Sequence, residues 1–250
     1  MKKILLLLIT GTFLSVGCKD KPKTKENNAV ESEITMNKDQ EKEWEDLSNG
    51  NDLEGWKAFN SDSISDQWKA EESTIAFTPA EGEREGTENL ITEKQYENFE
   101  LSLEWKISEG GNSGIMWGVQ EGENFSEPYL TGPEIQVLDN QGHPDAENGP
   151  IRQAGALYDM VPPSKDVTKP AGEWNDMLIR IDYEENKGSV KMNGTLVTEF
   201  PLHGDKWQEM VNNSKFRDWE NFGKTRKGHI ALQDHGDKVW YRNIKIKKLD

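Results

Sequence analysis

Polar side chains that could bind a ligand or transfer a proton gather in one short stretch of the sequence, residues 132–143. Glu134 and Gln136 are two residues apart, so in a β-strand both side chains project from the same face. Ile135 and Val137 then point from the other face into a core. A carboxyl beside an amide forms a hydrogen-bonding platform for sugar hydroxyls, which favours a carbohydrate site at this strand. A solvated strand face would carry the same pattern.

Two further candidates for proton transfer follow this strand. Asp139 points to the opposite face unless a β-bulge re-aims it, and bulges are common beside active sites. His143 comes four residues later. Oxygen donors on Asp139, Asn140 and Asp145 are of the type that holds calcium, although acidic loops without a metal are commoner. No other metal and no cofactor is predicted, because the domain has no cysteine and its histidines are scattered along the chain.

A second polar group lies near the end of the chain. Gln233 and His235 share one face of a predicted strand, as Trp240, Arg242 and Ile244 do in the next. The forked donors of Arg242 could hold a carboxylate or a sugar oxygen. His235 precedes a glycine, so it fits a turn position as well as a site.

Arg152 and Tyr158 form a third candidate group. Tyr158 ends a short β-like run at residues 155–158, which places its hydroxyl near the rim of a sheet. The sequence has no phosphate-cradling glycine loop and no nucleophile elbow. Substrate binding is the predicted role of Arg152 and Tyr158.

Alternating apolar and polar residues predict the elements that position these side chains. The alternation is longest in residues 99–108, and weaker examples follow in residues 178–183, 190–192 and 244–246. Asn193-Gly194 between two such runs is a strong hairpin signal. Such strands, separated by long loops, predict an all-β jelly-roll sandwich of two antiparallel sheets.

One helical insertion is expected near residues 205–222, where Asp205 could cap a helix from Lys206 to about Asn213. Its aromatic residues are expected to pack against the sandwich more often than they bind ligand: Trp207, Phe216, Trp219 and Phe222.

Composition limits the partners. The formal net charge is -16, which repels phosphate backbones and makes nucleic acid an unsuitable partner. Hydrophobic residues make up only 33% of the chain, so its nine Trp must fill much of the core. A two-layer β fold suits this composition, because one face of each strand can stay polar.

The first residues resemble a bacterial lipoprotein leader. Lys2 and Lys3 precede an apolar run that is too short to span a bilayer comfortably. The stretch ending at Cys18 resembles a lipobox, with Ser15 where the common pattern has Leu; an ordinary signal peptide with an incidental cysteine is the alternative. We expect a signal peptide at residues 1–17 and a domain at 44–250. Between them, residues 18–43 read as a flexible tether carrying lipidated Cys18.

Several ordered stretches together resemble the 3-keto-disaccharide hydrolase domain family. They are residues 47–56, 111–115, 134–140, 155–158, 170–175, 228–236 and 242–244. The resemblance implies a concanavalin A-like jelly roll that acts on glycosides oxidised at carbon 3 of the sugar. It also implies a Gram-negative cell envelope, where Lys19 after the lipidated cysteine favours the outer membrane.

Residues 134–139 also resemble the strand motif of laminarinase-type glucanases, which share the jelly roll. That motif reads Glu-x-Asp-x-x-Glu, whereas Gln136 and Asp139 stand at its second and third positions in this chain. A retaining mechanism needs two carboxyls about 5–5.5 Å apart, and this departure puts such a mechanism in doubt.

A ketone at carbon 3 permits another route, in which a base removes the hydrogen on carbon 2, the aglycone is eliminated and water adds back. In this hypothesis Glu134 or His143 is the base, and Asp139 or His235 donates the proton. Gln136, Gln233 and Arg242 hold the substrate. The alternatives are a non-catalytic carbohydrate-binding lipoprotein and a purely structural one; in each, only the lipid anchor meets the membrane.

Overall fold

The computed structural model describes residues 43–82 and 86–249. The predicted signal peptide, the lipidation site Cys18 and all but the last residue of the predicted tether lie outside the described residues. Within the described ranges, no helix is long and apolar enough to cross a membrane.

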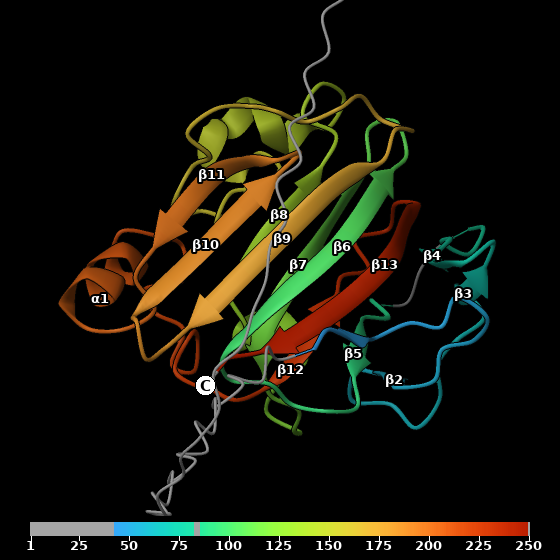
Figure 1. Cartoon of the computed structure of the whole chain (residues 1–250), viewed down its shortest axis with the longest axis horizontal. Helices are drawn as coiled ribbons and strands as arrows, with labels where there is room; N and C mark the ends of the chain where they lie inside the picture. Colours follow the sequence, from blue (N-terminus) through green and yellow to red (C-terminus); the bar gives the residue numbers. More distant parts are fainter. Residues whose placement is uncertain (1–42, 83–85, 250) are drawn as a thin grey trace, which may run out of the picture. The chain divides into compact units, whose positions relative to one another are not determined.

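The larger of two antiparallel sheets has eight strands (Figure 1). They are β1 (Glu45–Asp46), β3 (Trp68–Glu71), β4 (Thr74–Phe77), β6 (Phe99–Ile107), β9 (Asn175–Asp182), β10 (Lys187–Met192), β11 (Thr195–Phe200) and β13 (Val239–Lys248). Their order is β11-β10-β9-β6-β13-β4-β3, and β1 pairs with β13 beside this path.

The smaller sheet has five strands, in the order β2-β5-β12-β7-β8. They are β2 (Trp56–Ala58), β5 (Leu90–Thr92), β12 (His229–Leu232), β7 (Asn112–Val119) and β8 (Glu134–Leu138). Every pairing in both sheets between named strands is antiparallel. The predicted all-β sandwich of two antiparallel sheets is therefore confirmed.

The core lies between the two sheets. Along β6, Leu101, Leu103 and Trp105 are at most 2% exposed, while the residues between them are partly exposed. They belong to one cluster with Ile135 and Val137 of β8, from the other sheet. Burying each large apolar side chain contributes about 1.5–3 kcal/mol, so this layer holds the two sheets face to face.

The smaller sheet is buried on both faces, because β7, β8 and β12 are buried at every position. A second apolar cluster includes Met116, Val119 and Ala231, with Tyr129 packed against it. Strands covered on both sides lose the alternation of apolar and polar residues. This explains why the sequence pattern predicted β6 but gave no signal for β7.

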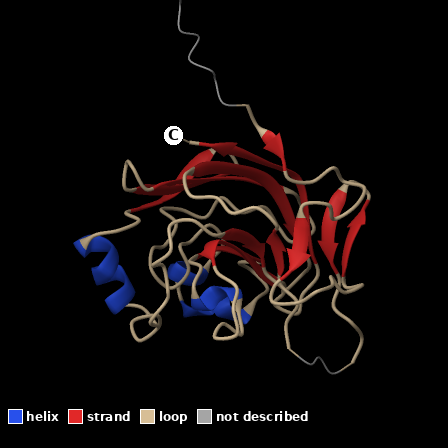
Figure 2. Ribbon diagram, turned by 90° about the horizontal axis from the view of Figure 1, so that it is seen from below, coloured by secondary structure: helices blue, strands red, loops and turns tan. Residues whose placement is uncertain are grey.

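Short helices are the remaining regular elements: α1 (Asp205–Asn212) and three 3-10 helices, η1 (Pro128–Leu130), η2 (Pro144–Asn148) and η3 (Pro150–Arg152). Figure 2 shows these helical segments gathered at one side of the domain. The predicted helix is present, but Asp205 is its first residue and not its cap. Gly204 occupies the N-cap position, and no side chain caps the helix there.

The predicted hairpin at Asn193-Gly194 joins β10 to β11. Both residues have positive φ, 48° and 75°. A two-residue turn with two positive φ angles matches the right-handed twist of paired strands, and Asn-Gly tolerates it best. The hairpin is confirmed.

Candidate functional site

A cavity of about 330 Å³ opens on the face of the smaller sheet that is turned away from the sandwich core. Its lining contains Asn112, Tyr129, Glu134, Gln136, Tyr158, Lys215, Phe216, Trp219, Gln233 and His235. The predicted alternation in β8 is correct, because Glu134 and Gln136 line this cavity while Ile135 and Val137 lie in the core.

Gly114 provides the space at the floor of the cavity. It pairs with Gln136 on one side, and on the other its carbonyl accepts a hydrogen bond of 2.9 Å from the N–H of Gln233. A Cβ atom on Gly114 would overlap the carboxyl of Glu134. The carboxyl therefore lies over the glycine, between the two glutamines.

Three amide oxygens around this floor have no protein hydrogen-bond partner: Oδ1 of Asn112, Oε1 of Gln136 and Oε1 of Gln233. All three residues are nearly buried, at 4%, 1% and 7% exposed. Gln136 donates its Nε2 to the carbonyl of Arg152 at 3.2 Å, which leaves its oxygen as the free end. Buried acceptors without partners are costly, and these three oxygens can accept hydrogen bonds from a molecule that enters the cavity.

Glu134 is the buried ionisable group of the cavity. Desolvation raises the pKa of its carboxyl to about 8, and the negative charge of Asp145 adds to this rise, whereas the positive charge of Lys215 opposes it. The carboxyl is therefore largely protonated at neutral pH, and it can exchange a proton within the range where enzymes work.

Lys215 and Tyr158 form one wall. The Nζ atom of Lys215 lies 4.2 Å from the centre of the Tyr158 ring and 5.2 Å from that of Phe216. Desolvation lowers the pKa of Lys215, although the negative charges of Asp159 and of Glu134 in its ionised form oppose that change. The wall thus presents a cation next to the carboxyl of Glu134.

Tyr158 is positioned by an extra strand-like contact at the edge of β8. Its N–H donates to the carbonyl of Glu134 at 3.0 Å, and Leu157 bridges to Ile135. Its hydroxyl donates to Oδ2 of Asp145 at 2.8 Å. Burial is the main cause that raises the pKa of the phenol above its usual range, and this hydrogen bond adds to the rise. The predicted placement of Tyr158 at a sheet rim agrees with this geometry.

Arg152 stands behind this wall and does not line the cavity. Its guanidinium forms ion pairs with Asp145 at 2.9 Å and Asp159 at 3.0 Å. The predicted contact of Arg152 with substrate is therefore corrected to a supporting role. Arg152 donates a hydrogen bond to Asp145, and Asp145 accepts one from the hydroxyl of Tyr158.

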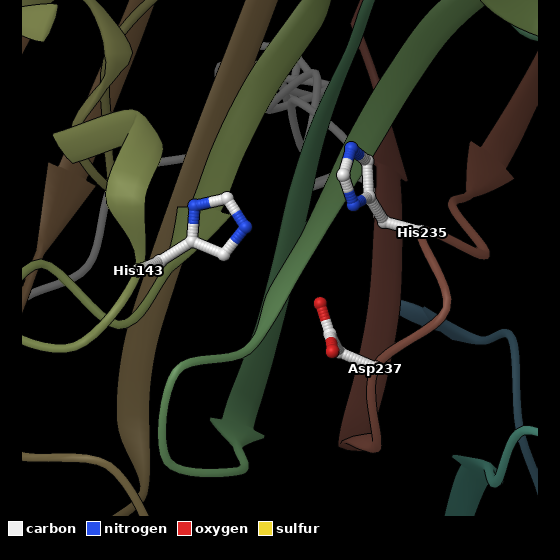
Figure 3. Close-up of side chains that lie close together, drawn as sticks. All are labelled: His143, His235 and Asp237. Atoms are coloured by element: carbon white, nitrogen blue, oxygen red, sulfur yellow. The ribbon is translucent and has the colours of Figure 1, made fainter.

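At the other end of the cavity, His143, His235 and Asp237 come together, with one nitrogen or oxygen of each within 4.8 Å of the others (Figure 3). The two imidazole rings are 5.9 Å apart and meet edge to face. Nδ1 of His143 accepts a hydrogen bond of 3.0 Å from the N–H of Asp145. Nε2 of His235 lies 3.3 Å from Nδ2 of Asn112.

The histidines that are scattered in the sequence are thus adjacent in the fold, an arrangement that sequence spacing did not reveal. The tautomer of His143 nevertheless disfavours an ion. Because Nδ1 of His143 accepts an N–H, its neutral ring carries the proton on Nε2, and a metal at the cluster would find no lone pair there. As built, the cluster is a hydrogen-bonding group.

Asp139 does not reach the cavity, which corrects its predicted role as proton donor. Its Oδ2 accepts from the N–H of Gly110 at 2.8 Å and its Oδ1 from the N–H of Gln141 at 3.1 Å. Strand β8 ends at Leu138, and the carboxylate of Asp139 then closes the turn that follows.

The calcium site predicted on Asp139, Asn140 and Asp145 does not fit these contacts. Oδ1 of Asn140 accepts from the N–H of Ala154 at 2.8 Å, and both oxygens of Asp145 bind protein donors, one of them cationic Arg152. The oxygens that would bind the ion are already engaged within the protein.

Arg242 lies on the other sheet, which corrects its predicted place in the cavity. Its Nη2 and Nε donate to Oε2 of Glu104 at 2.6 and 3.0 Å, and its guanidinium lies over the ring of Trp174 at 4.0 Å. A bulge after Arg242, with Asn243 at φ 53°, returns Ile244 to the core. Arg242 and Ile244 therefore do not share a face.

Five lining residues had no predicted site role: Asn112, Tyr129, Lys215, Phe216 and Trp219. Asn112 lies in a stretch that carried the family resemblance, which is the signal that could have found it. Phe216 and Trp219 were expected to pack, and they do, with rings 5.0 Å apart, but they also line the cavity.

Comparison with known proteins identifies the class to which this fold and site belong. Residues 43–247 match the model of the 3-keto-alpha-glucoside-1,2-lyase-like domain family, and the chain belongs to that family. A 3-keto-disaccharide hydrolase of Bacteroides thetaiotaomicron is 38% identical over 230 residues, which cover 82% of this chain and 78% of the relative.

Solved structures agree with this assignment. The crystal structure of a candidate glycosyl hydrolase from Parabacteroides distasonis has a TM-score of 0.76 and 31% identity, covering 83% of this chain and 94% of that one. The laminarinase of Rhodothermus marinus has a TM-score of 0.51 and 11% identity, covering 84% and 99%, and shows the fold alone. The expected concanavalin A-like jelly roll is confirmed.

The raised pKa of Glu134 predicts a pH-dependent stability. Below about pH 4.5 the carboxyl is protonated in both folded and unfolded chains, and it contributes nothing to the difference. Between pH 4.5 and about 8 only the unfolded chain loses the proton, so stability falls as pH rises, by about 1.4 kcal/mol per unit at most. Glu134→Gln should therefore gain stability relative to the wild type over this window, measured by denaturant unfolding. A constant difference across it would contradict the raised pKa.

Gly114→Ala should destabilise the fold by about 1–3 kcal/mol, because its Cβ overlaps the Glu134 carboxyl. The matched control removes that carboxyl: in a Glu134→Ala background the same glycine substitution should cost almost nothing. Unfolding free energies of the four proteins measure the coupling. Equal costs in both backgrounds would show that the two residues do not touch.

Proposed function

We propose that this domain cleaves glycosides whose sugar is oxidised to a ketone at carbon 3. The observation that carries the proposal is the set of three buried amide oxygens without partners around one cavity, because a sugar ring offers several hydroxyl donors at once. The volume of about 330 Å³ is at the lower end of the range of about 300–1,000 Å³ for small-molecule sites, which suits a single ring. The name of the Bacteroides relative supports the same substrate class.

The cavity favours elimination over a glucanase-type displacement. Among the described residues that line it, Glu134 alone has a carboxyl, whereas a retaining displacement needs two. A ketone at carbon 3 makes the hydrogen on carbon 2 acidic, so a base can remove it and the aglycone on carbon 1 can leave. Water then adds to carbon 1, and the net result is hydrolysis.

The chemistry needs two proton-transfer groups and a cation or donor near the ketone oxygen. Of the four proton-transfer candidates predicted from the sequence, Glu134 and His235 line the cavity. Asp139 closes a turn, and His143 contacts the ring of His235 but is not among the lining residues. Lys215 is placed to stabilise negative charge that develops on the ketone oxygen, a contribution of about 3 kcal/mol for one donor.

The full chain should release the aglycone from a 3-keto glucoside and leave the plain glucoside intact. Glu134→Gln should lose about 10²–10⁴-fold in turnover of alkyl 3-keto glycosides, since it removes a positioned proton-transfer group. The matched control, exposed Glu147→Gln, should retain the wild-type rate.

Other results would point elsewhere. Release from the plain glucoside alone would favour a laminarinase-type route. Binding of the 3-keto glucoside without release identifies a non-catalytic carbohydrate-binding lipoprotein, and no binding identifies a structural one. Release of aglycone and binding are measured on the same preparation by chromatography and calorimetry.

The place of action proposed from the sequence is the bacterial cell envelope, with the chain anchored in the outer membrane through a lipid on Cys18. The wild-type chain should then require detergent for extraction from membranes of a Gram-negative host. Cys18→Ala should instead be recovered in the aqueous fraction, and mass spectrometry should find no lipid. An equal distribution of both proteins would refute the anchor.

A further inference from the structure

We infer that His235 is the base that removes the hydrogen on carbon 2 and that Glu134 is the acid that protonates the departing oxygen on carbon 1. This assignment rests on the proposed function and goes beyond it, because both groups line the same cavity and either could take either role. Asp237 and His143 are assigned as the residues that position and tune His235.

The surroundings of His235 direct its lone pair toward the cavity. Figure 3 shows one ring nitrogen turned to the side of Asp237 and the other turned away from it. The second nitrogen, Nε2, faces Asn112 at 3.3 Å, longer than the usual 2.9–3.0 Å of a good N–H hydrogen bond. Asp237 is itself held by the N–H of Asn112 at 3.0 Å. A proton on Nδ1 beside this carboxylate leaves the lone pair on Nε2, where the long contact with Nδ2 of Asn112 has to give way before Nε2 accepts a proton from substrate.

Loss of hydration favours the neutral form of the His235 ring. Loss of hydration lowers its pKa, even though the residue is exposed, and the neighbouring ring of His143 lowers it further. The carboxylates of Asp237, Asp145 and Asp234 act in the opposite direction and do not reverse the change. A neutral imidazole is the form that accepts a proton.

The pKa of Glu134 is shifted in the opposite direction to that of His235. Its pKa of about 8 keeps the carboxyl protonated at neutral pH, with Asp145 and Lys215 as the charged groups that act on it. Two groups in one cavity whose surroundings drive their pKa values apart define the base and the acid. The protonated carboxyl is the donor, and the neutral ring is the acceptor.

The steps balance with these roles. Nε2 of His235 takes the proton from carbon 2, and the electrons of that C–H bond form the enolate with carbon 3. As the ketone re-forms, carbons 1 and 2 become doubly bonded, the bond from carbon 1 to the aglycone oxygen breaks, and that oxygen takes the proton of Glu134. Water then adds to carbon 1, giving its proton to Glu134 while His235 returns its own to carbon 2.

The test separates proton removal from bond cleavage. A 3-keto sugar in which hydrogen replaces the aglycone oxygen at carbon 1 (a 1,5-anhydro sugar) has no aglycone to expel. Exchange of its carbon-2 hydrogen in heavy water therefore reports the base alone. By NMR, His235→Asn should lose about 10²–10⁴-fold in this exchange, whereas Glu134→Gln should remain within a few-fold of wild type.

Leaving groups test the acid. Glu134→Gln should release nitrophenol from its 3-keto glucoside at close to the wild-type rate, because nitrophenolate leaves without a proton. The same variant should fail on alkyl 3-keto glucosides. His235→Asn should be slow on both substrates.

The positioning residues have opposite expected effects. Exchange requires neutral His235, so its rate falls below the pKa of that ring. Asp237→Asn removes a charge that raises this pKa and should move the fall to lower pH; His143→Gln removes a group that lowers it and should move the fall to higher pH. Residues that only support the fold would change the rate and leave the pH profile in place.

Three results would overturn the assignment. If Glu134→Gln abolishes exchange while His235→Asn preserves it, the roles are reversed and the proposed function stands. If a chelator abolishes exchange and a divalent ion restores it, the histidine cluster holds a metal. If the wild type releases aglycone without any exchange at carbon 2, cleavage does not begin with proton removal. A wild type that neither exchanges nor releases refutes the proposed function itself.

Discussion

Burial of one carboxyl on a covered sheet is the constraint on which the site depends. Most sandwiches leave the outer face of a sheet to solvent, where a glutamate would simply ionise. In this domain the outer face of the smaller sheet is covered, and Glu134 lies over a glycine and is buried. The fold thereby retains a neutral acid at a pH where an exposed glutamate would be charged.

The polar atoms around this carboxyl follow the same logic. Gln136 and Gln233 flank Gly114 on neighbouring strands, so the sheet ladder alone sets the spacing of their free oxygens. Strand-borne groups keep their positions better than loop-borne ones, so these two oxygens are held rigidly at the floor of the cavity. The wall that carries Lys215 comes instead from the segment after α1, which the sheet ladder does not constrain.

The sequence could predict what depends on local periodicity. Strand β6, the Asn193-Gly194 hairpin and the shared face of Glu134 and Gln136 all follow from spacing alone. Bulges and loop closures depend on tertiary contacts, and there the predictions failed: Arg242 precedes a bulge, and the Asp139 carboxylate binds backbone N–H groups of the turns around it. His143 and Asp237 meet at His235 through the fold, which no one-dimensional spacing reveals.

The run at residues 155–158 has a consequence beyond holding Tyr158. Strand β8 is an edge strand of its sheet and contains Ile135 and Val137. If it were uncovered, its unpaired N–H and C=O groups could pair with a strand of another polypeptide. The N–H of Gln136 instead donates to Ala156, its carbonyl accepts from Gly155, and Leu157 bridges to Ile135. Covering an edge in this way prevents intermolecular strand addition. The same few residues thus position Tyr158 in the cavity wall and protect the protein from self-association wherever many copies crowd together.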